Sequence, residues 1–225
     1  EFAIWSLLED PSARPTSLPE PVNGHNPALT ITKISNGSTW LQDPPADPNR
    51  NISSGGCLAF NGGNLFYALV GGGDNRFYRY NSTSDSWTQL TRIPNNLQIF
   101  PSPPDNYGLS VDTGSDLAYT GTWNNDLYAL VKGNPKGNNT PEADFLLQYS
   151  IPADSWDLAA KTPDELGAGA SLVYDGSSSL YAFQGGSGNF WRYSSSGWET
   201  LPAVPGPGQV GAGAALVHTG GNEIY

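Results

Sequence analysis

Internal repetition constrains the fold of this 225-residue chain more than any other feature. The segment GAGASLVYDGSSSLY at 167–181 aligns without a gap to GAGAALVHTGGNEIY at 211–225, with eight of fifteen positions identical. A further copy lies at 58–72, where two aromatic stretches flank a turn and a Gly-Gly doublet follows. A period of about 40–50 residues indicates a repeat architecture.

Each repeat contains four short stretches rich in β-branched and aromatic residues, separated by Gly, Asn, Asp and Ser. This alternation predicts a four-stranded antiparallel meander. Four strands in a period of this length are typical of the blade of a β-propeller. We therefore predict an all-β fold, a β-propeller built from four-stranded antiparallel blades.

The second half of each repeat carries a further pattern. The Gly-Gly doublet is followed by Arg-Tyr at 79–80 and 192–193, then by a tryptophan, and seven residues after the tryptophan by a proline. This pattern resembles the kelch repeat, and the resemblance covers roughly residues 28–225. It implies a kelch β-propeller but no particular function, because kelch propellers include both binding scaffolds and enzymes.

The phase of the repeat predicts a single domain, 1–225, with complete blades at 54–92, 107–160 and 169–201. Residues 211–218 are interpreted as the innermost strand of a fourth blade, and stretches within 1–41 as its other three strands. Both termini would then share one blade (1–41 and 211–225) and close the ring, which leaves no exposed sheet edge. The alternative is a fragment of a larger kelch propeller.

Composition excludes several classes of partner. The net charge is −11 with only 10 lysines and arginines, so nucleic acid is not an expected partner. No apolar run approaches the ~20 residues that span a bilayer, and we expect no membrane insertion. One cysteine, Cys57, allows no internal disulfide, and only His25 and His218 could supply imidazole, so we expect no metal and no cofactor.

Four Asn-x-Ser/Thr triplets occur, at Asn36, Asn51, Asn81 and Asn138. Such a density is compatible with a secreted glycoprotein, and we predict an extracellular location with these four asparagines as candidate glycosylation sites. The alternative is that a chain rich in Asn, Ser and Thr forms such triplets by chance.

A meander sends alternate connections to opposite ends of its strands, and the long connections here fall on one side only, at 9–27, 43–53, 95–106 and 132–144. Because binding and catalysis are commonly placed on elaborated loops, we predict that this side is functional. The candidate binding residues on it are His25, Asp74, Phe100, Asp105 and Tyr107. The alternative is that these proline-rich segments only cap the ring.

No catalytic motif accompanies the repeats: there is no H-E-x-x-H, no G-x-S-x-G and no phosphate-binding loop. The sequence therefore favours a secreted propeller that binds a carbohydrate or a protein, with no catalytic residue predicted. One alternative is a hydrolase or lyase acting on an extracellular polysaccharide, which would need acid–base groups at the mouth of the central channel. Another is a structural subunit that self-associates head to tail by strand complementation.

Overall fold

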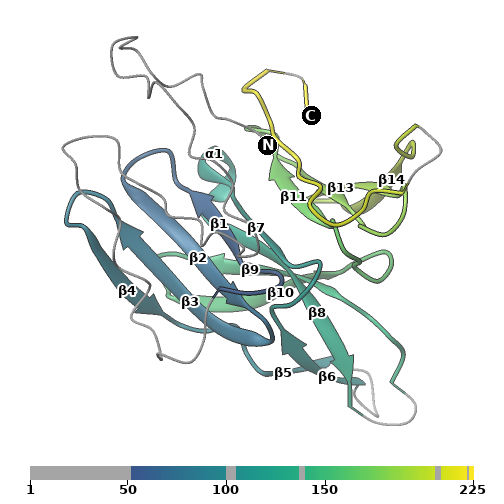
Figure 1. The fold of residues 1–225 in the computed structure, drawn as a ribbon, viewed down its shortest axis with the longest axis horizontal. Helices are drawn as coiled ribbons and strands as arrows, with labels where there is room; N and C mark the ends of the chain where they lie inside the picture. Colours follow the sequence, from purple (N-terminus) through teal and green to yellow (C-terminus); the bar gives the residue numbers. More distant parts are fainter. Residues whose placement is uncertain (1–51, 100–104, 137–139, 206–208, 222) are drawn as a thin grey trace, which may run out of the picture. The chain divides into compact units, whose positions relative to one another are not determined.

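The computed structural model describes residues 52–99, 105–136, 140–205, 209–221 and 223–225, all within one compact unit, Asp43–Tyr225. They form an all-β fold of antiparallel sheets (Figure 1). In this part of the chain the only helix is α1, the four residues Gly121–Asn124. No helix among these residues is long and apolar enough to cross a membrane.

Two of the three sheets are simple meanders of four strands, each strand pairing with the next in the chain. The first contains β1 (Cys57–Phe60), β2 (Leu65–Gly71), β3 (Asp74–Asn81) and β4 (Ser86–Leu90). The third contains β11 (Ser171–Tyr174), β12 (Leu180–Phe183), β13 (Phe190–Ser194) and β14 (Gly197–Leu201). Both have the strand order that the repeat predicts.

The middle sheet has six strands because two different strands pair, one after the other, with the same edge of one strand. Its meander consists of β7 (Asp116–Tyr119), β8 (Leu127–Pro135), β9 (Phe145–Ser150) and β10 (Ser155–Lys161). The first half of β8 pairs with β7, and the second half pairs with β6 (Asp105–Ser110), which pairs in turn with β5 (Asn96–Ile99). Tyr107, where the sequence places the start of the second repeat, therefore lies in an added strand, and the inner strand of this sheet is β7.

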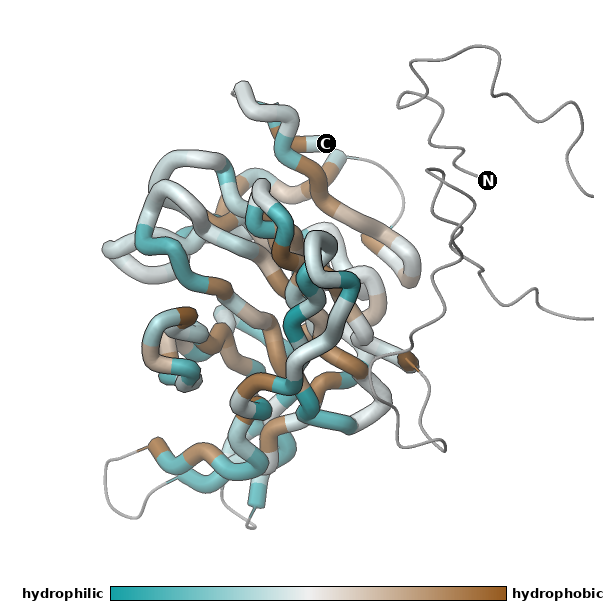
Figure 2. Tube along the Cα trace, turned by 90° about the vertical axis from the view of Figure 1, so that its left-hand side faces the viewer, coloured by the Kyte–Doolittle hydropathy of each residue, from teal (hydrophilic) through white to brown (hydrophobic). Residues whose placement is uncertain are grey.

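Neighbouring sheets pack face to face through equivalent residues of their inner strands. Ala59 of β1 shares a core with Leu117 of β7, and Ala118 of β7 shares a second core with Leu172 of β11. Because both faces of the middle sheet are covered, the first five residues of β8 are all buried, and they form a continuous apolar run. Figure 2 shows such hydrophobic stretches along the chain, with hydrophilic segments between them.

Asn75 and Asp144 occupy the same repeat position, 69 residues apart, and both side chains are buried. Each one connects its sheet to the segment that leads into the next sheet. The Asn75 Oδ1 accepts a hydrogen bond from the Val111 amide at 3.0 Å. The Asp144 Oδ2 accepts one from the Leu166 amide at 2.6 Å. Both amides immediately precede the turn that leads into the next inner strand.

The C-terminal segment was predicted to form an inner strand at 211–218, and in the structure it is largely irregular. It closes a short hairpin, in which His218 bridges Ile224 and Val217 exchanges two backbone hydrogen bonds with Tyr225, at 2.8 and 2.9 Å. It also contacts the third sheet, because the Leu216 amide donates to Ser171 Oγ at 3.0 Å. The strands predicted within 1–41 lie outside the described residues.

Candidate functional site

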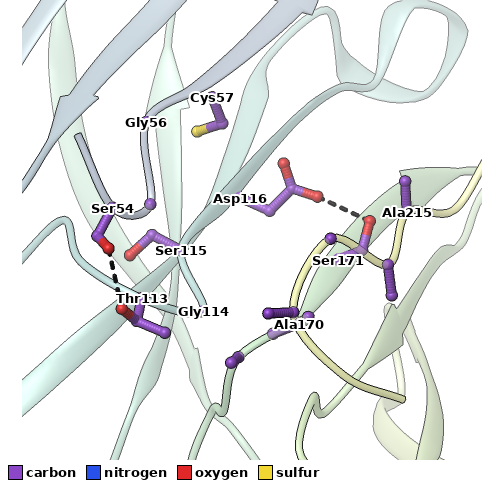
Figure 3. A pocket seen from close by; sticks show the side chains of 16 residues that line it. Ser54, Gly56, Cys57, Thr113, Gly114, Ser115, Asp116, Ala170, Ser171 and Ala215 are labelled. Atoms are coloured by element: carbon purple, nitrogen blue, oxygen red, sulfur yellow. Dashed lines mark hydrogen bonds between the residues drawn. The ribbon is translucent and has the colours of Figure 1, made fainter. Parts of the chain in front are cut away.

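Four equivalent turns surround a cavity of about 370 Å³ at the ends where the inner strands begin (Figure 3). In each turn the amide of the fourth residue donates to the carbonyl of the first, at 2.8–3.1 Å. The third residue of each turn is a glycine with φ between +75° and +91°, a conformation that side chains rarely adopt. The lining consists of residues 54–57, 113–116, 168–171 and 212–215.

These glycines also allow successive turns to approach one another. A Cβ on Gly55 would lie 2.0 Å from the Asp112 carbonyl oxygen, and one on Gly169 would lie 2.0 Å from that of Gly211. A Cβ on Gly114 would lie 2.9 Å from the Gly167 carbonyl oxygen. The fourth glycine has no such neighbour among the residues that the structure describes.

The first residues of β1, β7 and β11 place a thiol, a carboxylate and a hydroxyl at the cavity (Figure 3). The Asp116 Oδ2 accepts hydrogen bonds from Ser171 Oγ at 3.0 Å and from the Leu172 amide at 2.7 Å. Burial raises the pKa of Asp116. Burial also raises the pKa of the Cys57 thiol well above its usual value, and the charge of Asp116 adds to this effect.

The described lining holds one carboxylate and one thiol. Glycoside hydrolysis uses two carboxyl groups, and among the described lining residues Asp116 is the one carboxylate. A reactive cysteine needs a lowered pKa, whereas the pKa of Cys57 is raised. Nor do three His, Cys, Asp or Glu side chains gather as metal ligands within the described ranges. The sequence analysis did not predict this cavity. The signal that could have located it is the glycine that lies two residues before each inner strand.

Two of the predicted binding residues lie together in β6. Asp105 begins the strand and pairs with Ile99 of β5. Tyr107 is 1% exposed, its hydroxyl donates to the Pro141 carbonyl at 3.0 Å, and its ring lies edge-on to Phe145 at 4.8 Å between centroids. The ring of Tyr107 therefore belongs to the core under this part of the sheet. A binding role for either residue stays a prediction.

The other predicted residues are not brought to the same place. Asp74 begins β3 in the first sheet and is paired with Arg76, at 2.8 Å between Oδ2 and the guanidinium. Asn81 ends that strand, half-buried, and its Oδ1 accepts from the Thr83 amide at 2.9 Å. The remaining predicted positions lie outside the described residues, namely His25, Phe100, Asn36, Asn51 and Asn138.

The two long segments at 95–106 and 132–144, predicted to lie on one side of the fold, meet where the Lys136 amide donates to the Asn106 carbonyl at 2.8 Å, and residues 132–135 of β8 pair with residues 107–110 of β6, which follow directly. Alternate residues of β5 and β6 face the core. The positions between them share the opposite face, which we call the amide platform: the outward positions of β5, β6 and the end of β8. It carries Asn96, Gln98, Asn106, Gly108, Ser110, Lys132, Asn134 and Lys136, and the Lys132 ammonium is paired with Asp144.

The amide platform borders a cavity of about 700 Å³. Lys136 Nζ donates a hydrogen bond to Asn96 Oδ1, which links the end of β8 to β5. To do so it lies across Gly108, where a Cβ would be 2.9 Å from the Lys136 Cε. Asn134 Nδ2 donates to Ser110 Oγ at 3.2 Å. None of the outward strand positions of this platform is acidic.

Comparisons with known proteins give no name to this arrangement. No protein-family model matches the chain, and no curated protein matches it. Among solved structures, YjhT is similar at 14% sequence identity over 76% of this chain and 70% of YjhT, with a TM-score of 0.39. The resemblance to kelch repeats therefore rests on the sequence pattern.

Proposed function

We propose that this protein is a secreted, kelch-type β-propeller of four blades that binds a carbohydrate through the side on which its inner strands begin. One observation carries the binding function: two long segments on that side build an ordered sheet extension with a polar outer face. Side-chain amides both donate and accept hydrogen bonds, as sugar hydroxyls do. A protein ligand is less well matched, because protein interfaces depend on aromatic and arginine anchors.

Four closed blades are supported by two exposed apolar residues, Leu58 and Val217, whose equivalents at two adjacent repeat positions are buried in the other sheets. Leu117 and Leu172 are 4% and 5% exposed because each faces the preceding sheet, whereas their equivalent Leu58 is 58% exposed. Ala59 is 6% exposed because it faces the following sheet, whereas its equivalent Val217 is 56% exposed. In the proposed closed ring, Val217 and Leu58 would belong to one further interface between sheets, and the termini would share the fourth blade.

Cross-linking tests this closure. Because packed sheets lie about 10 Å apart, a short bismaleimide is a better reporter than a disulfide. In a Cys57→Ala background, the pair Leu58→Cys and Val217→Cys should be linked within one monomer, whereas Leu58→Cys with the exposed Leu158→Cys should not. Links between molecules at all concentrations would replace closure by head-to-tail assembly.

Binding itself is tested on a glycan array with the purified full-length chain, with turnover of the same polysaccharides measured in parallel. We expect saturable binding to at least one glycan class without release of reducing ends. Absence of binding to every glycan would refute the proposal. Robust turnover of a polysaccharide would favour the hydrolase or lyase, although the described lining of the inner cavity contributes one carboxylate, Asp116, and not a pair.

A further inference from the structure

The amide platform has properties that point to a particular ligand class. We propose that it is the carbohydrate site, and that its ligand is a neutral, hydroxyl-rich polysaccharide. This inference rests on the proposed function and deepens it, because it names the surface and the kind of sugar. The argument uses the geometry of three strands, the charge of the platform and the hydrogen-bonding capacity of its side chains.

The amides of the platform are arranged both across the strands and along them. Gln98 and Asn106 are direct cross-strand partners, and Gly108 is flanked by Asn96 on β5 and Asn134 on β8. Neighbouring strands lie about 4.8 Å apart, and outward residues on one strand recur about every 7 Å. The array therefore presents several polar groups within a few ångströms of one another, so that more than one of them can bind the same sugar chain. The amide of Gln98 is exposed, with no hydrogen-bond partner among the described residues.

Gly108 leaves room for the Lys136 side chain on this surface. It stands in the middle of the array, where any larger residue would push against the Lys136 side chain. The cavity of about 700 Å³ beside it is lined by Asn96, Gln98, Asn106 and Lys136, among others, and its volume is within the range of small-molecule sites. Leu97 and Tyr107 also line it, but the Tyr107 ring is buried and Leu97 packs against the core, so the exposed polar groups at the cavity are the amides and Lys136.

Charge selects a neutral ligand. Lys136 is the one cation bordering the cavity among the described residues, and its ammonium already donates to Asn96. The whole chain carries −11, so a polyanion would be repelled before it reached this single lysine. Amides, in contrast, bind hydroxyls without the desolvation that a buried charge requires. A neutral polysaccharide meets both conditions.

Affinity electrophoresis tests the proposal with defined probes: hydroxyethylcellulose and galactomannan as neutral polysaccharides, and polygalacturonate as an acidic one. The variants are Gln98→Ala and the double variant Gln98→Ala with Asn106→Ala. The matched control is Gln89→Ala, an exposed glutamine on β4 of the first sheet. Thermal midpoints within ~2 °C of wild type would show that all variants fold.

We expect a neutral polysaccharide to retard the wild type, and the double variant to bind it at least tenfold more weakly, while Gln89→Ala binds normally. If the wild type binds a glycan and the double variant binds it equally well, the platform is refuted and the proposed function stands. Stronger retardation by polygalacturonate would refute the neutral ligand class. If no glycan binds to the wild type on an array either, the proposed function itself fails.

Discussion

Replacing Asp144 by alanine should destabilise the fold severely, because this one carboxylate holds three groups. It is 1% exposed and accepts hydrogen bonds from the Gly133 amide at 2.8 Å and from the Leu166 amide at 2.6 Å. It also forms an ion pair with Lys132, at 2.6 Å. The contact with Leu166 spans 22 residues and fixes the chain that enters the third sheet.

The magnitude follows from the groups left behind. Each buried amide that loses its acceptor costs about 1–3 kcal/mol. Removing one partner of a buried ion pair costs about 3–5 kcal/mol, and Lys132 keeps some solvent access, with 26% of its side chain exposed. The contributions overlap, so we expect a loss of about 3–5 kcal/mol. In a domain of this size this lowers the thermal midpoint by about 10 °C.

The assay is thermal and urea denaturation of wild type, Asp144→Ala and Asp144→Asn. Asparagine is a meaningful control, because the equivalent repeat position is Asn75, whose Oδ1 accepts from the Val111 amide in the same way. Asp144 accepts on both oxygens, whereas asparagine has one acceptor, and its Nδ2 group would face either the Gly133 or the Leu166 amide; Asp144→Asn should therefore regain only part of the stability that Asp144→Ala loses. A thermal midpoint for Asp144→Ala within ~2 °C of wild type would refute the reasoning.

Two further predictions concern backbone space and pH. Gly169→Ala should destabilise the fold far more than Gly197→Ala. The two glycines have nearly equal φ, +87° and +90°, but a Cβ at 169 would lie 2.0 Å from the Gly211 carbonyl oxygen, whereas one at 197 would have no neighbour within 4 Å. Equal thermal midpoints for the two variants would contradict this prediction. Tyr149 donates to Asp154 at 2.5 Å and lowers its pKa, so the stabilisation from this carboxylate is present above an unfolded pKa of about 3.9 and lost as pH falls through the lower folded pKa. The difference in unfolding free energy between wild type and Tyr149→Phe should therefore be largest near neutral pH and shrink below pH ~4; a constant difference in denaturant titrations would exclude the linkage.

Much of the strand pattern could be predicted from the repeat. The match between 58–72 and 172–186 places the first two strands of the first and third sheets where β1, β2, β11 and β12 lie. Local pairing explains this success, because each strand of a meander pairs with its neighbour in the chain across a short turn. The glycines and aromatic residues that specify such pairing are therefore close together in the sequence.

The strands β5 and β6 could not be placed by the same reasoning. Leu97 and Ile99 alternate with polar residues, as do Tyr107 and Leu109, so a strand pattern is present. Its partner, however, is the second half of β8, and the pair Tyr107–Pro135 is 28 residues apart. The sequence pattern therefore predicts a loop at 95–106 and the start of a blade at Tyr107, whereas the structure places β5 and β6 there.

The sequence by itself determined the all-β class of the fold and the local strand order of the first and third sheets. Only the tertiary structure decided that two of the long connections join into one sheet, that Tyr107 points into its core, and that the amides gather on its outer face. The physical reason is that sequence periodicity encodes pairing between neighbours in the chain. Pairing between distant segments depends on which length of strand edge the neighbours leave free, and in this protein the nine-residue strand β8 extends past its partner β7.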